Sequence, residues 1–242
     1  MNNRLISVIT VCYNAEKTIE QTIKSVIEQS YSRIQYIIID GKSKDNTVSL
    51  IRQYNNYIDV FISEQDKGIY DAMNKGLKYT EGDYAIFMNA GDLFNSKTTV
   101  QEIMQYITDK QTIYFGNSIR SFYDCKELKI ERTNRFRITR KNICHQAIIY
   151  PSEYIKKIGY DLQYPILADW VLNIRLYKQL KFKHIDIPIC IFDETGISSS
   201  SDRLKDVNFI NNLCQLTIDN LGYLPWLYLK IRRLIRCILC QS

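Results

Sequence analysis

The sequence lacks two glycine-rich signatures of nucleotide-binding proteins. No G-x-G-x-x-G follows the first apolar stretch, and no G-x-x-x-x-G-K-[ST] occurs anywhere in the 242 residues. These absences argue against a dinucleotide cofactor and against a P-loop. The chain also contains no internal repeat and no low-complexity segment.

Long hydrophobic runs are missing as well. No window is apolar enough for long enough to span a bilayer, and residues 1–4 lead directly into a strand pattern rather than a signal peptide. Apolar residues make up 45% of the chain and charged residues 24%, which is ordinary for a soluble globular protein. We therefore expect a cytosolic protein of one domain, with at most a short appendage.

The cysteines do not form a disulfide pattern. Their number, seven, is odd, and they lie in apolar segments such as residues 11–12 and 189–191. This usage is typical of small buried residues in a reducing compartment. Cys237 and Cys240 have C-x-x-C spacing, but there is no second pair, so we do not expect zinc.

The net charge of +6 does not by itself indicate a nucleic-acid partner, because the excess is local. Residues 132–141 and 230–236 hold much of it. We expect a solvated loop at residues 132–141, and the alternative is a segment that contacts phosphate.

Strands alternate with helices over the first 92 residues. Apolar, β-branched runs predict strands at 5–12, 36–39, 58–62 and 84–88, and helical periodicity predicts helices around 19–27, from Asp45 onward, and at 69–79. Such a βαβ series predicts a parallel sheet with right-handed crossovers.

Every one of these strands ends in polar residues. The ends carry Tyr13 and Asn14, then Asp40, then Glu64 and Asp66, then Asn89 and Asp92. In a parallel sheet these ends lie at the same edge, where open α/β folds bind ligands. Structural capping would explain each end alone, but together they describe a ligand crevice.

The Asn89-Ala90-Gly91-Asp92 turn is central to this prediction. A carboxylate there suits a hard divalent cation, and such a cation suits a diphosphate. The alternative is a strand–turn joint that Asp92 caps.

The pattern changes after residue 92. We predict helices at 97–106, 152–158, 167–179 and 203–220, strands at 112–116, 118–123, 128–130 and 147–150, one or two strands within 182–190, and a polar loop at 195–201. Gly159 is expected to end the second of these helices.

The last segment, residues 221–242, predicts an amphipathic helix. Its apolar residues share one face: Leu224, Leu227, Tyr228, Ile231, Leu234, Ile235 and Ile238. Lys230, Arg232, Arg233 and Arg236 lie on the other side, with Trp226 on the flank. A basic amphipathic helix with a tryptophan is typical of membrane-surface binding. The alternative is a helix docked on the core.

Together these pieces resemble a family 2 inverting glycosyltransferase of the GT-A fold. The matching motifs are residues 7–14, Ile38-Ile39-Asp40-Gly41 with Ser43 and Asp45, residues 71–76, Gly82-Asp83-Tyr84, and Asn89-Ala90-Gly91-Asp92. The resemblance is strong over residues 5–95 and weaker to about residue 195. Residues 64–76 look like the branch found in bacterial exopolysaccharide, capsule and O-antigen clusters.

The resemblance implies an α/β GT-A domain at 1–220, followed by the helix at 221–242. Its Rossmann-like nucleotide-binding half, with a mostly parallel central sheet, would be 1–95, and its acceptor half 96–220. The donor would be a nucleotide-sugar, most often a UDP-sugar. The implied nucleotide-site residues are Val11 and Tyr13 at the base, Asp40 at the base or ribose, Glu64, Asp66 and Lys67 as the next wall, Asn74 near the sugar, and Asn89, Ala90 and Gly91 at the last strand end.

The sequence departs from the family pattern in three places. Gly41 stands where many members carry a second acid that contacts the base, so that contact must come from the main chain or from Asp66. Of the family's Asp-x-Asp-Asp pattern, Asp92 alone is kept, and we predict it as the ligand of Mg²⁺ or Mn²⁺. Met73 replaces an arginine that could contact the diphosphate.

The resemblance also suggests the acceptor-side residues. Asp169, near the start of a predicted helix where an anion is stabilised, is the candidate general base, and the alternative is an N-cap or first-turn acid. Trp170 would form a platform for an acceptor sugar, or else pack in the core. His145 and Gln146 would bind the acceptor or a diphosphate rather than catalyse.

The expected function is inverting sugar transfer to a lipid-linked saccharide in cell-surface polysaccharide biosynthesis. The protein would be peripheral on the inner face of the cell membrane, with no nucleic-acid partner. One alternative is a non-catalytic nucleotide-sugar-binding scaffold. A sugar-nucleotide nucleotidyltransferase is the other, but it would need a glycine-rich basic loop that residues 11–16 do not provide.

Overall fold

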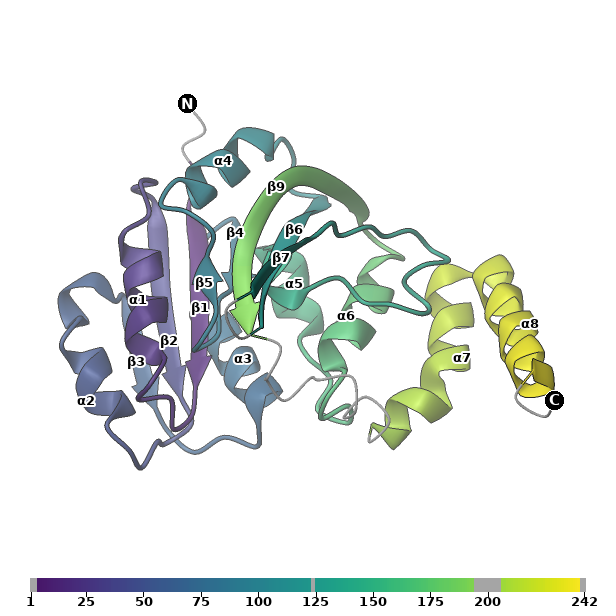
Figure 1. The fold of residues 1–242 in the computed structure, drawn as a ribbon, viewed down its shortest axis with the longest axis horizontal. Coiled ribbons are helices and arrows are strands. Elements are labelled where there is room, and N and C mark those ends of the chain that lie inside the picture. Colours follow the sequence, from purple (N-terminus) through teal and green to yellow (C-terminus); the bar gives the residue numbers. More distant parts are fainter. Residues whose placement is uncertain (1–3, 123–124, 194–205, 240–242) are drawn as a thin grey trace.

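A mixed sheet runs through the middle of the molecule, with helices on both faces (Figure 1). The structure is a computed structural model, and it describes residues 4–122, 125–193 and 206–239. The nine strands found in these ranges form one sheet in the order β3-β2-β1-β4-β8-β6-β9-β5, with β7 paired to β6.

The N-terminal half has the predicted βαβ order. Strands β1 (Ile6–Cys12), β2 (Ile34–Asp40), β3 (Val60–Ser63) and β4 (Tyr84–Phe87) are parallel, and β1 lies between β2 and β4. The helices between them are α1 (Ile19–Ile27), α2 (Thr47–Arg52) and α3 (Ile69–Lys78). A 3-10 turn, η1 (Asn55–Tyr57), precedes β3. The sequence prediction of this half is confirmed.

The second half adds both parallel and antiparallel strands. It contains β5 (Leu93–Phe94), α4 (Thr99–Tyr106), β6 (Thr112–Phe122), β7 (Cys125–Lys129), η2 (His145–Ala147), β8 (Ile148–Pro151), α5 (Ser152–Ile158), α6 (Ala168–Leu176) and β9 (Lys181–Asp193). Strand β8 is antiparallel to both β4 and β6, whereas β9 runs parallel to β6. The strand predicted at 128–130 corresponds to the end of β7, which forms an antiparallel hairpin with β6.

The prediction of separate strands at 112–116 and 118–123 is wrong. One strand, β6, covers both, and its register with β9 shifts around Asn117. A Cβ at Gly116 would lie 2.6 Å from the carbonyl oxygen of Ile187, so glycine allows the β9 backbone to approach closely. Gly116 therefore lies at an irregular point inside a strand.

Two hydrophobic cores form, one on each face of the sheet. Alternate residues of β1 point to opposite faces, so Ile9 joins the core under α3, whereas Val8 joins the core that includes α1. The first core continues through α6 and α7 to Leu229. Helices from both ends of the chain therefore belong to hydrophobic cores that share one continuous sheet.

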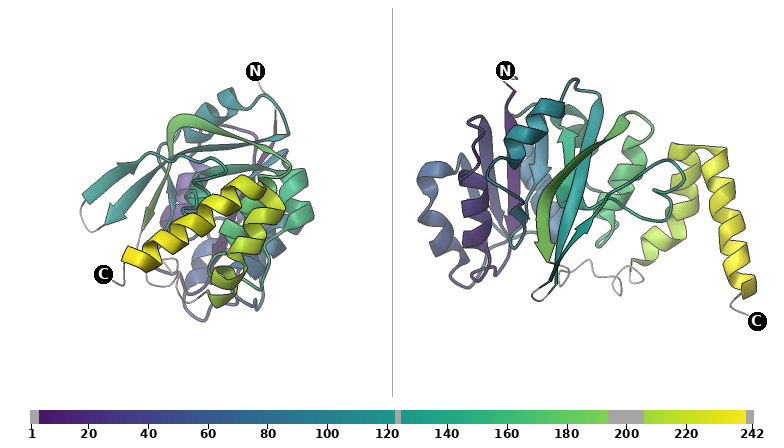
Figure 2. Two further views of the ribbon diagram at one scale, coloured as in Figure 1. Left: turned by 90° about the vertical axis from the view of Figure 1, so that its right-hand side faces the viewer. Right: turned by 45° about the horizontal axis from the view of Figure 1, so that its top comes forward.

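The C-terminal helices form the end of the molecule opposite α1 and α2 (Figure 2). Helix α7 (Val207–Leu221) packs against α6, and α8 (Tyr223–Leu239) packs against α7 through the buried Leu229. The predicted apolar face of α8 remains largely exposed, with Leu224 66% and Leu234 63% accessible. Within the described ranges, no helix has the length and apolarity needed to cross a bilayer.

Candidate active site

The carboxyl ends of the N-terminal strands are joined to one another. After β1, the amide of Asn14 donates to Oγ of Ser43 at 2.8 Å, and Oδ1 of Asn14 accepts from the amide of Lys44 at 2.9 Å. After β4, the amide of Ala90 donates to the carbonyl of Val11 at 3.2 Å. These bonds bring the polar strand ends together at one edge of the sheet.

Asp40 connects the loops at this edge through its carboxylate. It is fully buried, and its carboxylate accepts hydrogen bonds from the hydroxyl of Ser43 at 2.5 Å, the amide of Ser43 at 3.0 Å and the hydroxyl of Ser63 at 2.6 Å. The carboxylate therefore fixes the loops after β2 and β3, which shape the predicted nucleotide site.

Tyr13 and Val11 have different surroundings. The ring of Tyr13 is 57% exposed and lies next to Gly41, in a position to stack on a base, whereas the side chain of Val11 is buried in the core with Ile9 and Ile39. The buried side chain of Val11 is therefore not exposed for the predicted contact with a base.

Gly41 leaves room for Asp66. A Cβ at residue 41 would overlap Oδ2 of Asp66, which comes from the end of the next strand, and would touch the ring of Tyr13 at 3.4 Å. The Asp66 carboxylate thus occupies the space of the side chain that Gly41 lacks.

The loop before α3 is held by its charged residues. Oδ1 of Asp66 accepts from the amide of Gly68, which has a φ of 119°, and Glu64 pairs with Lys75 at 2.9 Å. Lys75 also donates to the carbonyl of Gln65 at 2.7 Å. Lys67 is exposed. Glu64 and Asp66 therefore shape this wall, and Lys67 is available to solvent.

Asn74 joins the two halves of the domain. Its side-chain amide donates to the carbonyl of Tyr160 and accepts from the amide of Tyr160, both at 2.8 Å. Asn74 therefore positions the loop after α5. The ring of Tyr160 stacks on Tyr70 with a centroid separation of 5.3 Å.

The turn after β4 brings Asp92 to Gln146. Oδ2 of Asp92 accepts from the side-chain amide of Gln146 at 2.7 Å. The turn is fixed by Thr22, which accepts from the amide of Gly91 and donates to the carbonyl of Asp92, both at 2.9 Å. A predicted acceptor residue and the predicted metal ligand are thereby brought together.

This turn offers oxygen atoms to a hard cation. Oδ1 of Asn89 is buried and has no hydrogen-bond donor, and an orphaned oxygen beside an acidic turn fits a divalent cation. In the described part of the chain, no three His, Cys, Asp or Glu side chains group closely enough to hold a metal ion. Asp92 would therefore need oxygens from the donor and from water to complete a shell.

Asp169 receives hydrogen bonds from both halves of the domain. Tyr70 on α3 donates its hydroxyl to Oδ1 at 2.9 Å, and Asn142 donates its amide to Oδ2 at 2.7 Å. Behind Asn142, the amide of Asn173 donates to Asn142 at 2.8 Å and the hydroxyl of Tyr150 donates to Asn173 at 2.9 Å. Each hydrogen bond in this chain of donors is directed toward the carboxylate, which fixes the orientation of its two oxygens.

Sequence reasoning had assigned no role to Tyr70 or Asn142. Tyr70 lies inside the motif that carries the resemblance, so its position was a usable signal. For Asn142 no such signal exists, because its contact with Asp169 spans 27 residues and depends on tertiary structure.

His145 is buried and bonded within the protein. Its Nε2 lies 2.7 Å from the hydroxyl of Tyr160, and its Nδ1 is buried without a partner. Burial lowers its pKa to about 3. The imidazole is therefore neutral at ordinary pH, and the residue supports Tyr160 rather than facing solvent.

Trp170 follows the alternative prediction, core packing. The side chain is 6% exposed, and its Nε1 donates to the carbonyl of Ile138 at 2.6 Å. Its ring lies 4.8 Å from that of Phe209 on α7. Residue 138 and α7 therefore cover most of the ring, and what remains accessible lines a cavity between the start of α6 and the C-terminal helices.

Comparison with known proteins agrees with this architecture. Residues 7–202 match the domain described as Glycosyl transferase family 2. An uncharacterized glycosyltransferase of Mycobacterium tuberculosis is 30% identical over 204 residues, covering 80% of this chain and 77% of the relative. A relative from Escherichia coli is named UDP-Glc:alpha-D-GlcNAc-diphosphoundecaprenol beta-1,3-glucosyltransferase. It is 27% identical over 174 residues, which cover 72% of this chain and 64% of the relative.

Two solved structures share the fold. TarS 1–349 of S. aureus in complex with UDP aligns with a TM-score of 0.68 at 17% identity, covering 89% of this chain and 65% of the other. A mannosyltransferase of Pyrobaculum calidifontis in complex with GDP-Man and Mn²⁺ aligns with a TM-score of 0.63 at 15% identity. The alignment covers 78% of this chain and 56% of the other. This chain thus spans 65% and 56% of those structures, and the likeness shows a GT-A fold. By the extent of its domain match, the chain belongs to glycosyl transferase family 2.

Proposed function

We propose that this protein is an inverting glycosyltransferase that moves a sugar from a UDP-sugar to a lipid-linked saccharide. The observation that carries the proposal is the position of Asp169, which hydrogen-bonds Tyr70 of the nucleotide-binding half and Asn142 of the acceptor half. A carboxylate held at the junction of two substrate sites is suited to general base catalysis.

In the proposed reaction, Asp169 accepts the proton of an acceptor hydroxyl. The hydroxyl oxygen forms a bond to the anomeric carbon from the face opposite the nucleotide, and the bond from that carbon to the diphosphate oxygen breaks. Inversion follows from this single displacement. Because Tyr70 and Asn142 fix both carboxylate oxygens, the base is oriented before substrate binds.

The donor site would use the strand ends. Tyr13 would stack on the base, and Asp66, lying over Gly41, would supply the polar contact to the base that Gly41 cannot. The similar fold of a protein solved with UDP supports a uridine nucleotide. We propose Asp92, with Asn89 nearby, as the residue that would hold Mg²⁺ or Mn²⁺. When bound, such an ion neutralises charge on the leaving diphosphate.

The acceptor would be a saccharide on a lipid diphosphate at the inner face of the cell membrane. The printed substrate of the Escherichia coli relative is of this kind. The exposed apolar face of α8, flanked by Lys230 and Arg233, is the kind of surface that binds anionic membranes. Helix α8 would keep the enzyme near such an acceptor.

A non-catalytic nucleotide-sugar-binding scaffold is the second candidate. The reduced acidic motif at Asn89-Ala90-Gly91-Asp92 favours it. The donor network around Asp169 argues for the enzyme, since a scaffold has no need for an oriented base at the junction of the two halves.

Calorimetric titration with UDP, GDP and CMP, with and without Mn²⁺, tests the donor. UDP binding that Mn²⁺ strengthens, and that Asp92→Ala weakens, is expected; absence of binding by all three nucleotides would overturn the proposal. The Asp169→Asn variant then tests the base. It should bind UDP normally and lose sugar transfer by on the order of 10²–10⁴-fold. Full transfer by this variant would exclude Asp169 as the base.

A further inference from the structure

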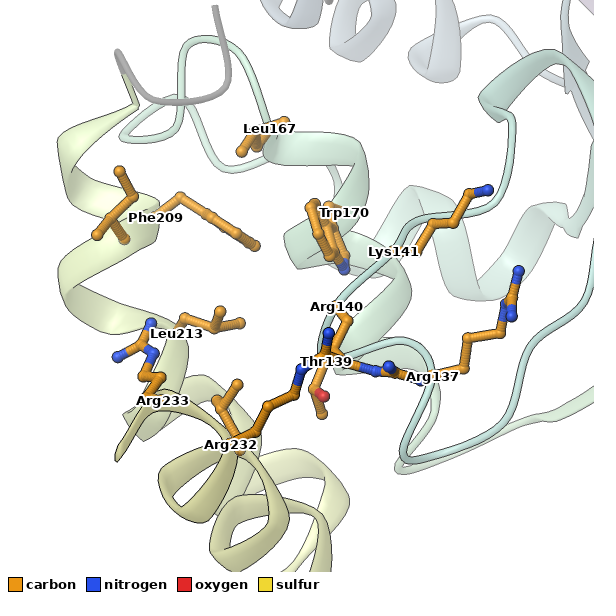
Figure 3. Close-up of a pocket in the computed structure, with 12 residues that line it drawn as sticks. Arg137, Thr139, Arg140, Lys141, Leu167, Trp170, Phe209, Leu213, Arg232 and Arg233 are labelled. Atoms are coloured by element: carbon orange, nitrogen blue, oxygen red, sulfur yellow. The ribbon is translucent and has the colours of Figure 1, made fainter. Parts of the chain in front are cut away.

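A cavity of about 500 Å³ lies beside the start of α6, the helix that carries Asp169 (Figure 3). It is enclosed by α6, by residues 137–141, and by the two C-terminal helices α7 and α8. The site described above makes no use of it.

The rim of the cavity is strongly cationic. Five positively charged residues line it: Arg137, Arg140, Lys141, Arg232 and Arg233. Across the described residues, no acidic side chain lines the cavity and none of these five pairs with a carboxylate. A group of unneutralised cations around a hollow is suited to an anion with several oxygens.

Two further observations on the charged residues of the cavity favour a bound anion. The Nε of Arg137 is buried and has no acceptor among the described residues. Burial, and then the neighbouring charge of Lys129, lower the pKa of Lys141. A bound anion would provide the missing acceptor and would offset the crowding of positive charge.

The floor of the cavity is apolar. Leu167 and Trp170 contribute from the start of α6, Phe209 and Leu213 from α7, and Leu229 from α8. Figure 3 shows Arg232 extending from α8 toward Thr139 and Arg140, while Trp170, Phe209 and Leu213 line the opposite side. A free phosphate has no apolar part to cover the six apolar side chains Leu167, Trp170, Phe209, Ile210, Leu213 and Leu229, whereas an anionic lipid has both a charged head and an apolar tail.

The cavity adjoins the candidate base through two segments. Trp170, on its floor, follows Asp169 directly in α6. Lys141, on its rim, precedes Asn142, which hydrogen-bonds Asp169 at 2.7 Å. An anion bound here would therefore contact the two segments that also hold Asp169 and Asn142.

We infer that this cavity binds the diphosphate of the lipid-linked acceptor, with the first isoprenyl units of the lipid on the apolar floor. The inference rests on the proposed function, because it names where that acceptor is held. Helix α8 forms one wall of the cavity through Leu229, Arg232 and Arg233, and its exposed apolar face would place the cavity at the membrane surface.

Farnesyl diphosphate is a soluble probe for this site, and Trp170 is a built-in reporter. The chain has two tryptophans, so the Trp226→Phe protein reports Trp170 alone. We expect saturable change in its fluorescence with farnesyl diphosphate, and at least tenfold weaker binding of inorganic diphosphate and of farnesol. Arg137→Ala with Arg232→Ala should weaken farnesyl diphosphate binding at least tenfold.

A matched control removes the same charge from the same two segments. Arg135→Ala with Lys230→Ala lies outside the cavity lining and should keep binding within twofold. Arg232→Gln alone serves if the first pair unfolds. Equal loss in both pairs, no saturable binding, or equally tight binding of inorganic diphosphate would each overturn the inference. Binding to phosphatidylglycerol vesicles without binding to farnesyl diphosphate would also overturn it.

UDP titration of the same variants separates the two proposals. UDP binding should be unchanged by the cavity substitutions, because the nucleotide crevice lies at the strand ends. If the unaltered protein binds no nucleotide, the proposed function fails. If it binds UDP and not farnesyl diphosphate, only the acceptor site fails.

Discussion

The hydroxyl of Tyr70 lies 2.9 Å from Oδ1 of Asp169, although 99 residues separate them in sequence. The same hydroxyl lies 2.8 Å from the carbonyl of Ile166, just before α6. Tyr70 is in the first turn of α3, which the nucleotide-side loop precedes. This contact therefore connects the donor site to the candidate base.

Tyr70→Phe tests that connection. Loss of the hydroxyl removes one hydrogen bond that orients Oδ1 of Asp169, so kcat for sugar transfer should fall about tenfold, equivalent to about 1.4 kcal/mol. The Kd for UDP should stay unchanged. Steady-state kinetics together with UDP titration measure both quantities.

A matched variant controls for stability. Tyr36→Phe also removes a buried hydroxyl, which contacts Thr10 at 3.1 Å on the other core. Each variant should lower the free energy of unfolding by about 1 kcal/mol, but Tyr36→Phe should keep kcat. If kcat falls equally in the two variants, Tyr70 acts through stability alone. If Tyr70→Phe keeps the kcat of the unaltered protein, the hydroxyl does not orient the base.

The relation between Gly41 and Asp66 predicts a pairwise effect on UDP affinity. Gly41→Asp alone crowds the Asp66 carboxylate and should weaken UDP binding about tenfold, or about 1.4 kcal/mol. In the double variant Gly41→Asp with Asp66→Ala, the new carboxylate has room, and binding should return to within about threefold. Calorimetry on the two single variants and the double variant gives the coupling. Additive losses would mean that the two positions do not share one role.

Much of the nucleotide-binding half could be predicted from the sequence. The β-branched runs at β1 and β2 and the polar residues that end each strand are local signals, and local signals were enough for these elements. Helix α5 and its end at Gly159, which has a φ of 64°, were likewise read from neighbouring residues.

The contacts of the acceptor side could not be read in this way. Asp169 and Trp170 are adjacent in sequence, yet one faces Tyr70 and the other packs on Phe209. Which residue faces which neighbour depends on where α3 and α7 lie. In α8 the sequence predicts the helix but not how it packs. Among the side chains that the structure describes in this helix, residues 223–235, Leu229 is the one that joins the core.

The low pKa of His145 predicts a pH-dependent stability. In the unfolded chain the imidazole titrates near pH 6.5, whereas in the folded protein its pKa is about 3. Between these values the unfolded state binds a proton that the folded state does not, so stability is full above pH 6.5 and falls as the pH is lowered. The free energy of unfolding should drop by about 2 kcal/mol from pH 7 to pH 5 through this residue.

Urea unfolding at pH 7, 6 and 5 measures this drop. His145→Gln can keep a hydrogen bond to Tyr160 but cannot take up a proton, so its stability should fall less over the same interval. Parallel pH profiles for the variant and the unaltered protein would show that His145 is not the group responsible.

The exposed apolar face of α8 predicts reversible membrane binding. Ile231 and Leu234 are both exposed on this face, and inserting them into the interface would remove their apolar surface from water. Ile231→Glu with Leu234→Glu should lower co-sedimentation with phosphatidylglycerol vesicles at least tenfold, since both apolar area and charge attraction are lost. UDP binding should be unaffected, because the changes lie far from the strand ends.

The control places the same substitutions on exposed apolar residues elsewhere. Tyr57 and Leu162 are also accessible, and neither lies on the C-terminal helices. Tyr57→Glu with Leu162→Glu adds the same negative charge, so a purely electrostatic effect would reduce vesicle binding equally in both proteins. Loss confined to the α8 variant would instead show that this helix inserts, and binding that survives both would mean that another surface meets the membrane.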